Sequence, residues 1–445
     1  MGRCHENITL KILIMAYQYK MKLTPEQIDI LEGRQGAVKA KVMETIVRYG
    51  DMFEATELVP VTHGEGHLVT SFGLSLLKPV YRIMDELIDA GLKVEAGFTA
   101  DPRPHDMKNV HYNPIDKRIN KKILYGKQDA YEEQLRKLGL KNDDSFTCTC
   151  YYPEIGNVPG KGDILSWAES SAVNYANSVL GARCNRNSGM IELFGSIVGF
   201  VPKFGLLTDE GRKAKWKVTV NTTKKPIPQI LGSAIGIKVM EDVPYVVGLD
   251  KWIGNELTDQ CKSYLKDFGA ATASNGAVGL YHIENVTPEA KELGEALLEA
   301  DYKEYVIDDA ELERVYKSYP VMWKQPQKEG TIAFIGCPHL SKTQLEEWAD
   351  RIISGLKSAG KTKVACQTVL CTPSPIRKEF EKTARYAELR KAGVGVTSIC
   401  PLMYTSNPLT KSRRIMTCSN KLRTYSLARY YKDDELLAII TGKED

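Results

Sequence analysis

Hydrophobic and polar positions along this chain follow two alternating periods, one typical of helices and one typical of strands. Apolar residues recur at helical spacing over residues 76–90 and 376–392, and residues 308–316 are also amphipathic. Short apolar or alternating runs are typical of strands. They occur at residues 92–99, 217–220, 278–282, 331–336, 363–368 and 394–399. Strands that alternate with helices in this way predict an α/β protein.

Two helix starts are predicted with particular clarity because each carries a capping box. Thr24 is followed by Pro25 and, three residues on, by Gln27, and Ser341 is followed by Gln344. In a capping box the Ser or Thr side chain accepts a backbone N–H of the first turn, and the Glu or Gln side chain bonds back to the cap. Proline at the first helical position has its φ already set for a helix. We therefore expect helices to begin directly after Thr24 and Ser341.

The chain is long enough for two or three domains. We expect an N-terminal α/β domain at residues 21–145, a central domain at 146–325 and a C-terminal α/β domain at 326–445, because residues 318–330 are rich in Pro, Gln and Lys. Residues 1–20 differ from the rest and are predicted to be a disordered extension, with Met21 as a second candidate start. Their apolar run is too short to cross a bilayer and lacks the cleavage site of a signal peptide.

Composition excludes several function classes. Of the 445 residues, 43% are hydrophobic and 26% are charged, and the formal net charge is only +4. Because no Lys/Arg block is present, the chain lacks the electrostatic footprint of a nucleic-acid binder, and we expect neither nucleic acid nor a membrane as a partner. No phosphate loop, dinucleotide-binding glycine motif or G-x-S-x-G elbow occurs. Nucleotide chemistry and serine hydrolysis are therefore not expected.

The ten cysteines are scattered along the chain, which argues against a disulfide framework and favours a cytoplasmic protein. Cys148, Cys337 and Cys400 each follow an apolar run, and the last two precede proline. Strand ends in α/β proteins face the crevice where ligands gather. Proline after a cysteine also removes a competing backbone donor. Ligation of a metal or cluster is therefore one hypothesis for these three cysteines, and burial as small apolar side chains is the other.

Residues 163–189 form an unusually polar segment with few Lys or Glu residues. Ser170, Asn174, Asn177 and Ser178 fall on one face of the predicted helix. A guanidinium binds carboxylate or phosphate bidentately. The segment therefore predicts an anion-binding site, and a solvated helix face is the alternative; the candidate substrate-binding residues here are Asn177, Ser178, Arg183, Asn185 and Arg186.

Two further clusters of polar residues could contribute to a site. His63 and His67 flank a glycine-rich loop, which suits substrate contact or proton transfer better than metal binding, because two histidines on a loop lack further ligands. Ser419 and Asn420 lie in a polar segment near the C-terminus, which is otherwise explained as a basic surface turn.

The order of several motifs resembles the catalytic large subunit of the aconitase X family. Thr147-Cys148-Thr149 is followed by the sequence AESSAV at residues 168–173 and NSVLGAR at residues 177–183. Further downstream stand GCPHL at residues 336–340, then Cys400 and Ser419-Asn420. The matching motifs extend over nearly all of the chain from Met21 onward.

This resemblance implies an α/β body like the first three domains of aconitase, arranged around a central iron–sulfur cleft. It also implies that Cys148, Cys337 and Cys400 are the cluster ligands, with Cys150 as an alternative to Cys148. The expected cofactor is a 4Fe-4S cluster, or otherwise a 2Fe-2S cluster. His63, Ser170 and Ser171 are candidate catalytic residues, and Ser419 and Asn420 are candidate substrate-binding residues.

The implied activity is that of a hydro-lyase acting on a small anionic hydroxy acid. Family members dehydrate cis-3-hydroxy-L-proline or mevalonate 5-phosphate. The first is slightly preferred here, because no dedicated phosphate loop is visible. The family's swivelling domain has no counterpart in this sequence, so we expect a separate small subunit as partner. A non-catalytic iron–sulfur sensor or scaffold, and a mononuclear-metal enzyme that uses the His63/His67 loop, are the other hypotheses.

Overall fold

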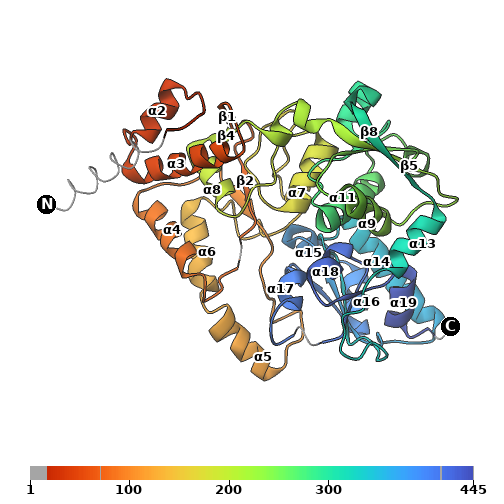
Figure 1. The fold of residues 1–445 in the computed structure, drawn as a ribbon. Coiled ribbons are helices and arrows are strands. Elements are labelled where there is room, and N and C mark those ends of the chain that lie inside the picture. The colour runs from red at the N-terminus through yellow and green to blue at the C-terminus, as the bar shows by residue number, and fades with distance from the viewer. Residues whose placement is uncertain (1–17, 71, 411–412, 444–445) are drawn as a thin grey trace.

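The computed structural model describes residues 18–70, 72–410 and 413–443. The extension predicted at residues 1–20 falls mostly outside the described residues. Three α/β regions follow one another along the chain and surround the centre of the molecule (Figure 1). In the part of the chain that the structure describes, every helix is too short or too polar to cross a membrane.

The first region combines helices with four very short strands. Its outer helices are α2 (Pro25–Leu31), α3 (Ala37–Met52), α4 (Lys78–Asp89), α5 (Pro114–Ile119) and α6 (Gln128–Leu138), and a π-helical turn covers Asn120–Leu124. The strands are β1 (Leu58–Pro60), β2 (Gly66–Leu68), β3 (Phe98–Ala100) and β4 (Phe200–Pro202). Strands β2 and β3 pair in parallel, and β1 pairs with β4 in antiparallel fashion. Helix α7 (Ser170–Tyr175), a second π-helical turn (Ala176–Leu180) and α8 (Ile191–Val198) complete the region.

The second region is a four-stranded parallel sheet in the order β7-β6-β5-β8. Its strands are β5 (Ala214–Val220), β6 (Pro244–Val247), β7 (His282–Ile283) and β8 (Leu298–Ile307). Its helices are α9 (Pro228–Val239), α10 (Asp250–Ile253), α11 (Asp259–Gly276), α12 (Pro288–Leu293) and α13 (Asp309–Lys317). Helices α9 and α11 approach closely because they meet at glycines; a Cβ on Gly236 would lie 2.7 Å from the carbonyl oxygen of Thr272.

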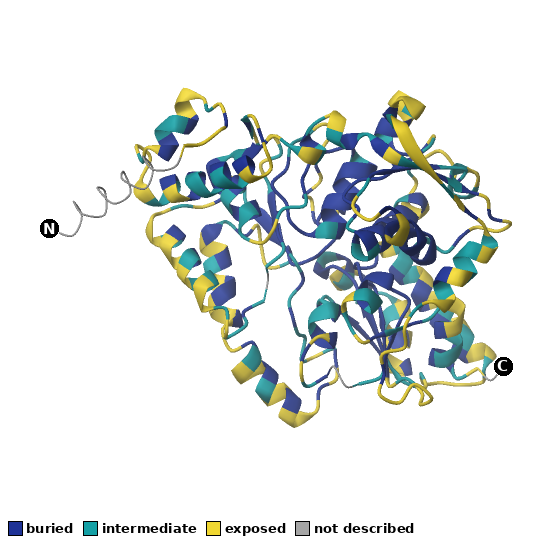
Figure 2. Ribbon diagram, viewed as in Figure 1, coloured by how far each residue is buried: buried dark blue, intermediate teal, exposed yellow. Residues whose placement is uncertain are grey.

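The third region is a five-stranded parallel sheet in the order β11-β10-β9-β12-β13. Its strands are β9 (Ile332–Ile335), β10 (Gln367–Cys371), β11 (Val394–Thr397), β12 (Ile415–Thr417) and β13 (Arg429–Tyr430). Its helices are α14 (Lys342–Ser358), α15 (Ser374–Phe380), α16 (Ala384–Ala392), α17 (Pro401–Thr405), α18 (Asn420–Tyr425) and α19 (Asp433–Thr441). Every residue of β9 and β11 is buried, as continuous apolar runs in a parallel sheet should be (Figure 2).

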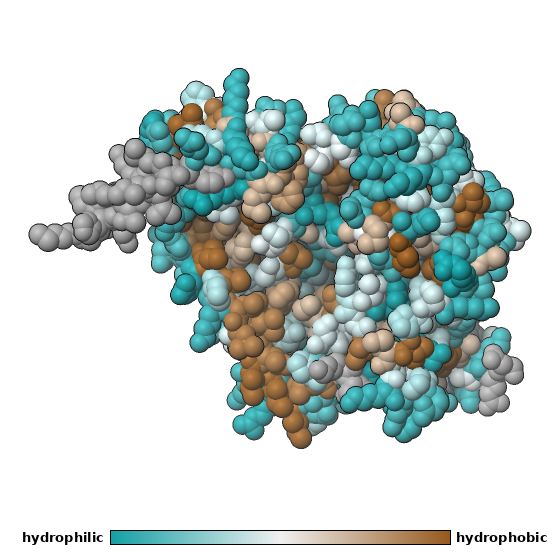
Figure 3. Space-filling model, in the orientation of Figure 1, coloured by the Kyte–Doolittle hydropathy of each residue, from teal (hydrophilic) through white to brown (hydrophobic). Residues whose placement is uncertain are grey.

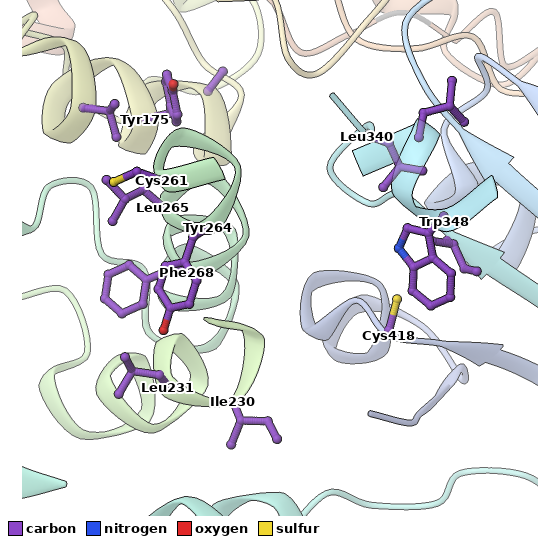
Figure 4. Close-up of a cluster of buried hydrophobic side chains, with 14 of the residues drawn as sticks. Tyr175, Ile230, Leu231, Cys261, Tyr264, Leu265, Phe268, Leu340, Trp348 and Cys418 are labelled. Atoms are coloured by element: carbon purple, nitrogen blue, oxygen red, sulfur yellow. The ribbon is translucent and has the colours of Figure 1, made fainter. Parts of the chain in front are cut away.

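One large hydrophobic core joins the second and third regions and includes α7 of the first, and a separate core packs helices α2, α3, α4, α6 and α8 of the first region. Figure 4 shows the larger core, with Leu231 of α9 beside Phe268 of α11 on one side and Trp348 of α14 beside Cys418 on the other. Because one core spans the second and third regions, the sheet that precedes Cys337 and Cys400 is held in one packed body with the second region.

The predicted α/β class and both capping boxes are confirmed, since the side chains of Thr24 and Ser341 each accept the expected backbone N–H. Other boundaries were wrong. The predicted helix at 376–392 is two helices, α15 and α16, because the Thr383 side chain caps a new helix. The strand predicted at 363–368 belongs at Gln367–Cys371, and the one predicted at 92–99 begins only at Phe98 and ends at Ala100.

Candidate active site

Short parallel segments from the first and third regions end at one central cavity. Strand β3 runs into Asp101, and parallel bridges align Ala100 with Phe146, His67 with Trp167 and Arg103 with Ile399. The backbone N–H of Cys400 donates to the carbonyl of Arg103 at 2.8 Å, which joins the two regions at this point. The carboxyl ends of these segments therefore converge, in the position where α/β folds gather ligands.

The cavity has a volume of about 370 Å³ and is lined by both polar and apolar side chains. The chemically active lining residues are Asp101, Cys148, Glu169, Cys337, Cys400 and Lys421. The apolar side is formed by Val69, Phe72, Leu402 and Met403. A concave, largely apolar pocket with a few converging polar groups is typical of a small-molecule site.

The three cysteines predicted as ligands all line this cavity. Burial raises the pKa of Cys337 to about 11 and that of Cys400 to about 12, and it also raises the pKa of Cys148 well above its usual value. The Lys421 ammonium opposes this rise at each of the three thiols, because a nearby cation favours the thiolate. In the absence of a metal these thiols are therefore protonated at neutral pH, and a metal must displace those protons on binding.

Cys150, the alternative to Cys148, lies elsewhere. It is fully buried, does not line the cavity and interacts with the imidazole of His67. Cys148 lines the cavity, and its sulfur accepts the backbone N–H of His339 at 3.5 Å. Of Cys148 and Cys150, the geometry therefore favours Cys148 as the residue that could bind a metal in the cavity.

A buried ion pair joins the first and third regions beside the thiols. The Lys421 ammonium donates to the Glu169 carboxylate and, at 3.0 Å, to the Ser171 hydroxyl. Glu169 also accepts the Ser171 hydroxyl at 2.7 Å and the backbone N–H of Ala172 at 2.6 Å. Burial raises the pKa of Glu169, but Lys421 and these hydrogen bonds outweigh it and hold the pKa below its usual range. Glu169 is therefore a carboxylate, and it is neutralised inside the protein rather than by solvent.

Asp101 presents the second carboxyl group of the cavity and is paired with a buried histidine. His67 Nε2 lies 3.5 Å from Asp101 Oδ1. Burial raises the pKa of Asp101 to about 6, and the neighbouring His67 works against that rise. Burial lowers the pKa of His67, but Cys150 and Asp101 outweigh it and raise the pKa to about 10. A carboxyl group whose pKa lies near neutrality in a cavity is suited to proton transfer.

Hydrogen bonds on the far side of His67 fix its protonation. Asn157 Nδ2 donates to Thr99 Oγ1 at 2.9 Å, and the Thr99 hydroxyl donates its single proton to the carbonyl of Gly66. His67 Nδ1, 2.9 Å from Thr99 Oγ1, must then be a donor. His63 Nε2 bonds to Asn157 Oδ1 at 2.8 Å, so His63 lies behind His67 and does not line the cavity.

The predicted anion-binding residues are placed away from the cavity lining. Asn177 and Ser178 are buried and bond to the backbone of Gly279 and Tyr281, at 2.9 Å in both cases. Arg183 pairs with Asp209 at 2.5 Å, Asn185 bonds to Phe204 and Leu206, and Arg186 donates to Ala277. The polar helix face is therefore neither solvated nor open to a ligand in this structure, and an anion clamp at these residues stays a prediction.

The remaining predicted residues lie in or beside the cavity wall. Ser170 lines the cavity, and Ser171 lies behind it as a partner of Glu169 and Lys421. The Ser419 hydroxyl donates to the carbonyl of Cys337 and accepts the N–H of Leu422, and Asn420 bonds to Gln229 of α9. Ser419 and Asn420 thus hold the start of α18, which places Lys421 in the cavity.

Reasoning from the sequence missed Asp101, His67 as its partner, Lys421 and His339. A usable signal existed for Asp101, because it directly follows the strand-like run that ends in Phe98-Thr99-Ala100. Within the described residues, no three His, Cys, Asp or Glu side chains come close enough to share a single metal ion. Cys148, Cys337 and Cys400 line one cavity, and cysteine thiolates are the usual protein ligands of iron–sulfur clusters.

Comparison with known proteins agrees with this organisation. Models of the aconitase X first, second and third domains match residues 20–210, 214–317 and 331–433. The phosphomevalonate dehydratase large subunit of Thermococcus kodakarensis is 33% identical over 74% of this chain and 77% of its own length. That of Methanosarcina mazei is 30% identical over 91% of this chain and 92% of its own length.

A hydroxyproline dehydratase and a solved structure are also similar to this chain. The cis-3-hydroxy-L-proline dehydratase of Hypocrea jecorina is 27% identical over 91% of this chain but only 65% of its own length. The crystal structure of Thermococcus kodakaraensis aconitase X in its holo-form superposes with a TM-score of 0.77 at 27% identity, covering 94% of this chain and all of that one. The chain therefore belongs to the aconitase X family of dehydratases.

Proposed function

We propose that this chain is the large, cluster-carrying subunit of an iron–sulfur hydro-lyase, with Cys148, Cys337 and Cys400 as the cluster ligands. The observation that carries the proposal is that these three thiols, from segments far apart in sequence, line one cavity together with Asp101 and the Glu169–Lys421 pair. When bound, an iron–sulfur cluster with one iron free of protein ligands supplies a Lewis acid for the departing hydroxyl group.

Asp101 is the residue that we propose as the general base. Its carboxylate faces the cavity, while the protonated His67 behind it holds the carboxylate in place. The base takes the proton from the carbon next to the one that bears the hydroxyl group, and the electrons of that C–H bond form the double bond. The Lys421 ammonium, held by Glu169, favours the thiolate forms that the three cysteines need in order to bind a cluster.

Activity is expected to fall as the pH drops below about 6. A general base works in its deprotonated form, and burial raises the pKa of Asp101 to about 6, so kcat/KM should decline about tenfold per pH unit below that value. Asp101→Asn should lower kcat by about 10²- to 10⁴-fold while iron content stays at the wild-type level. A wild-type acid limb that persists unchanged in a partly active Asp101→Asn enzyme would assign the base to another group.

The substrate that we propose is phosphomevalonate rather than cis-3-hydroxy-L-proline, which reverses the slight preference drawn from the sequence. Phosphomevalonate dehydratase large subunits share up to 33% identity with this chain, and several match nearly its full length. The hydroxyproline dehydratases are longer proteins, of which this chain covers 65% and 43%. The apolar cavity wall of Val69, Phe72 and Leu402 also suits a branched aliphatic chain.

A separate small subunit is the partner that we propose, because the phosphomevalonate relatives are named large subunits. An apolar surface suited to such a partner covers the start of α4, helix α5 and the π-helical turn at Asn120–Leu124 (Figure 3). Leu76, Ile115 and Ile123 are 89%, 71% and 63% exposed there. Leu76 lies only four residues after Phe72, which lines the cavity. The Ser75 hydroxyl donates to the carbonyl of Ile123 at 2.6 Å, so the segment before α4 is bonded to the π-helical turn. Large exposed apolar patches are typical of interaction sites.

Co-expression with an aconitase X small subunit tests both proposals. The two chains should purify as a heterodimer that dehydrates phosphomevalonate, and the large chain alone should show at most about a hundredth of that rate, since a shared active site is incomplete without its second half. Both candidate compounds should be assayed in parallel. Turnover of cis-3-hydroxy-L-proline alone would overturn the substrate assignment, and full activity of the isolated large chain would overturn the partner.

A further inference from the structure

One buried histidine contacts all three of the segments that carry the proposed cluster ligands. His339 stands two residues after Cys337 and is fully buried. Its Nδ1 lies 3.0 Å from the hydroxyl of Thr147, the residue before Cys148. Its Nε2 lies 2.9 Å from the carbonyl oxygen of Ile399, the residue before Cys400. Thr147 lies 192 residues before His339 in the sequence, and Ile399 lies 60 residues after it. The ring therefore connects three segments that are distant in sequence.

The direction of these hydrogen bonds can be assigned. A carbonyl oxygen only accepts, so Nε2 must carry a proton and donate it to Ile399. The Thr147 hydroxyl accepts the backbone N–H of Thr149 at 3.1 Å and lies 3.0 Å from the Thr149 hydroxyl. In a neutral imidazole that donates through Nε2, Nδ1 is an acceptor, so the Thr147 hydroxyl donates its proton to Nδ1. The ring therefore uses one donor and one acceptor, each toward a different cysteine segment, and neither nitrogen is left unpaired.

The backbone of His339 strengthens the same connection. Its N–H donates to the sulfur of Cys148 at 3.5 Å. Its carbonyl accepts the hydroxyl of Tyr152 and the ammonium of Lys266, both at 3.1 Å. These two partners lie in the loop after Cys148 and in α11, so His339 is anchored to all three regions of the protein.

We propose that His339 is a positioning residue that sets the spacing of Cys148, Cys337 and Cys400 for one iron–sulfur cluster. The proposal rests on the proposed function, because it takes these cysteines as the ligands. Groups that orient metal ligands through hydrogen bonds are worth about 10- to 100-fold in metal affinity. His339 differs from the usual case because a single side chain orients two ligand segments and belongs to the third.

The test compares His339→Leu with His282→Leu, a matched control. His282 is also buried, and its Nε2 also bonds to a backbone carbonyl, that of Arg212 at 2.8 Å, but it lies in the second region, away from the three cysteine segments. Each protein is purified anaerobically, reconstituted with iron and sulfide, and analysed for bound iron, visible absorption and loss of iron to a chelator. His339→Leu should release iron about 10- to 100-fold faster, with an altered spectrum, whereas His282→Leu should match the wild type.

A graded variant separates positioning from simple loss of stability. His339→Gln keeps an amide donor near the position of Nε2, so it should recover part of the iron retention. If His339→Leu fails to fold, His339→Gln and His339→Asn carry the comparison. Wild-type iron retention and spectrum in a folded His339→Leu protein would overturn the proposal while leaving the function intact. Absence of a cluster from the wild-type protein would instead overturn the proposed function.

Discussion

Replacing Cys400 by alanine is expected to abolish the iron–sulfur absorption of this protein. Cys400 lines the cavity beside Cys148 and Cys337, and its backbone is held by Arg103. Outer partners of a metal ligand are already worth about 10- to 100-fold in affinity, so loss of a direct ligand should lower cluster retention by at least about 100-fold. Iron and sulfide analysis of the anaerobically purified variant measures this directly, and dehydratase activity should fall with it.

Two other cysteines serve as controls for the same experiment. Cys261 is buried on α11 and Cys366 is half-buried near β10, and neither lines the cavity. Their alanine variants should keep the wild-type iron content and lose only about 1 kcal/mol of stability through packing. Normal iron loading in Cys400→Ala would remove this residue from the ligand set.

Replacing Lys421 by methionine is expected to produce the largest loss of stability of any single change at the cavity. The substitution leaves the Glu169 carboxylate buried without its cation, and breaking one partner of a buried pair costs about 3–5 kcal/mol. It also removes the cation that favours the thiolate forms of Cys148 and Cys337. Iron retention should therefore fall together with the midpoint of denaturant unfolding.

Paired variants show whether the effect comes from the unpaired charge. The double variant Glu169→Gln, Lys421→Met should recover much of the lost stability, because no charge is then left buried. The exposed pair of Lys161 with Glu292 provides the control, since Lys161→Met should cost at most about 1 kcal/mol. Equal losses in Lys421→Met and Lys161→Met would mean that the buried pair has no special role.

The pH dependence of the buried pair follows from both of its pKa shifts. Glu169 has a lowered pKa, so its contribution is lost as the pH falls through that value. Burial lowers the pKa of Lys421, but Glu169 and the neighbouring thiols outweigh it and raise the pKa, so its contribution is lost only at strongly alkaline pH. The pair should therefore stabilise the protein fully between about pH 5 and pH 10.

Local patterns predicted the parts of the fold that local chemistry determines. The capping boxes at Thr24 and Ser341 and the buried strand β9 each depend on residues that are close together in the sequence, and the structure confirms them. The interruption at Thr383 was missed because residues 376–392 contain no glycine or proline, so only the threonine cap marks the new helix.

The candidate site was predictable only in part, because its residues meet through tertiary structure. The polar face with Asn174 and Asn177 looked like a binding surface, but its partners are backbone groups near residues 278 and 279, about a hundred positions away. Asp101 and Lys421 have no short motif around them, and their roles depend on partners in other regions. Cys148, Cys337 and Cys400 were singled out by the apolar runs before them and by the family resemblance. The structure brings all three to one cavity, and their role as ligands stays a prediction.

Iron and acid-labile sulfide in the anaerobically purified wild-type protein show whether this chain binds an iron–sulfur cluster. A triple variant, Cys148→Ala, Cys337→Ala, Cys400→Ala, shows whether these three cysteines hold it. We expect equal amounts of iron and sulfide in the wild type, with broad visible absorption, and neither iron nor sulfide in the triple variant. Iron without sulfide in the wild type, or a cluster that persists in the triple variant, would contradict this proposal.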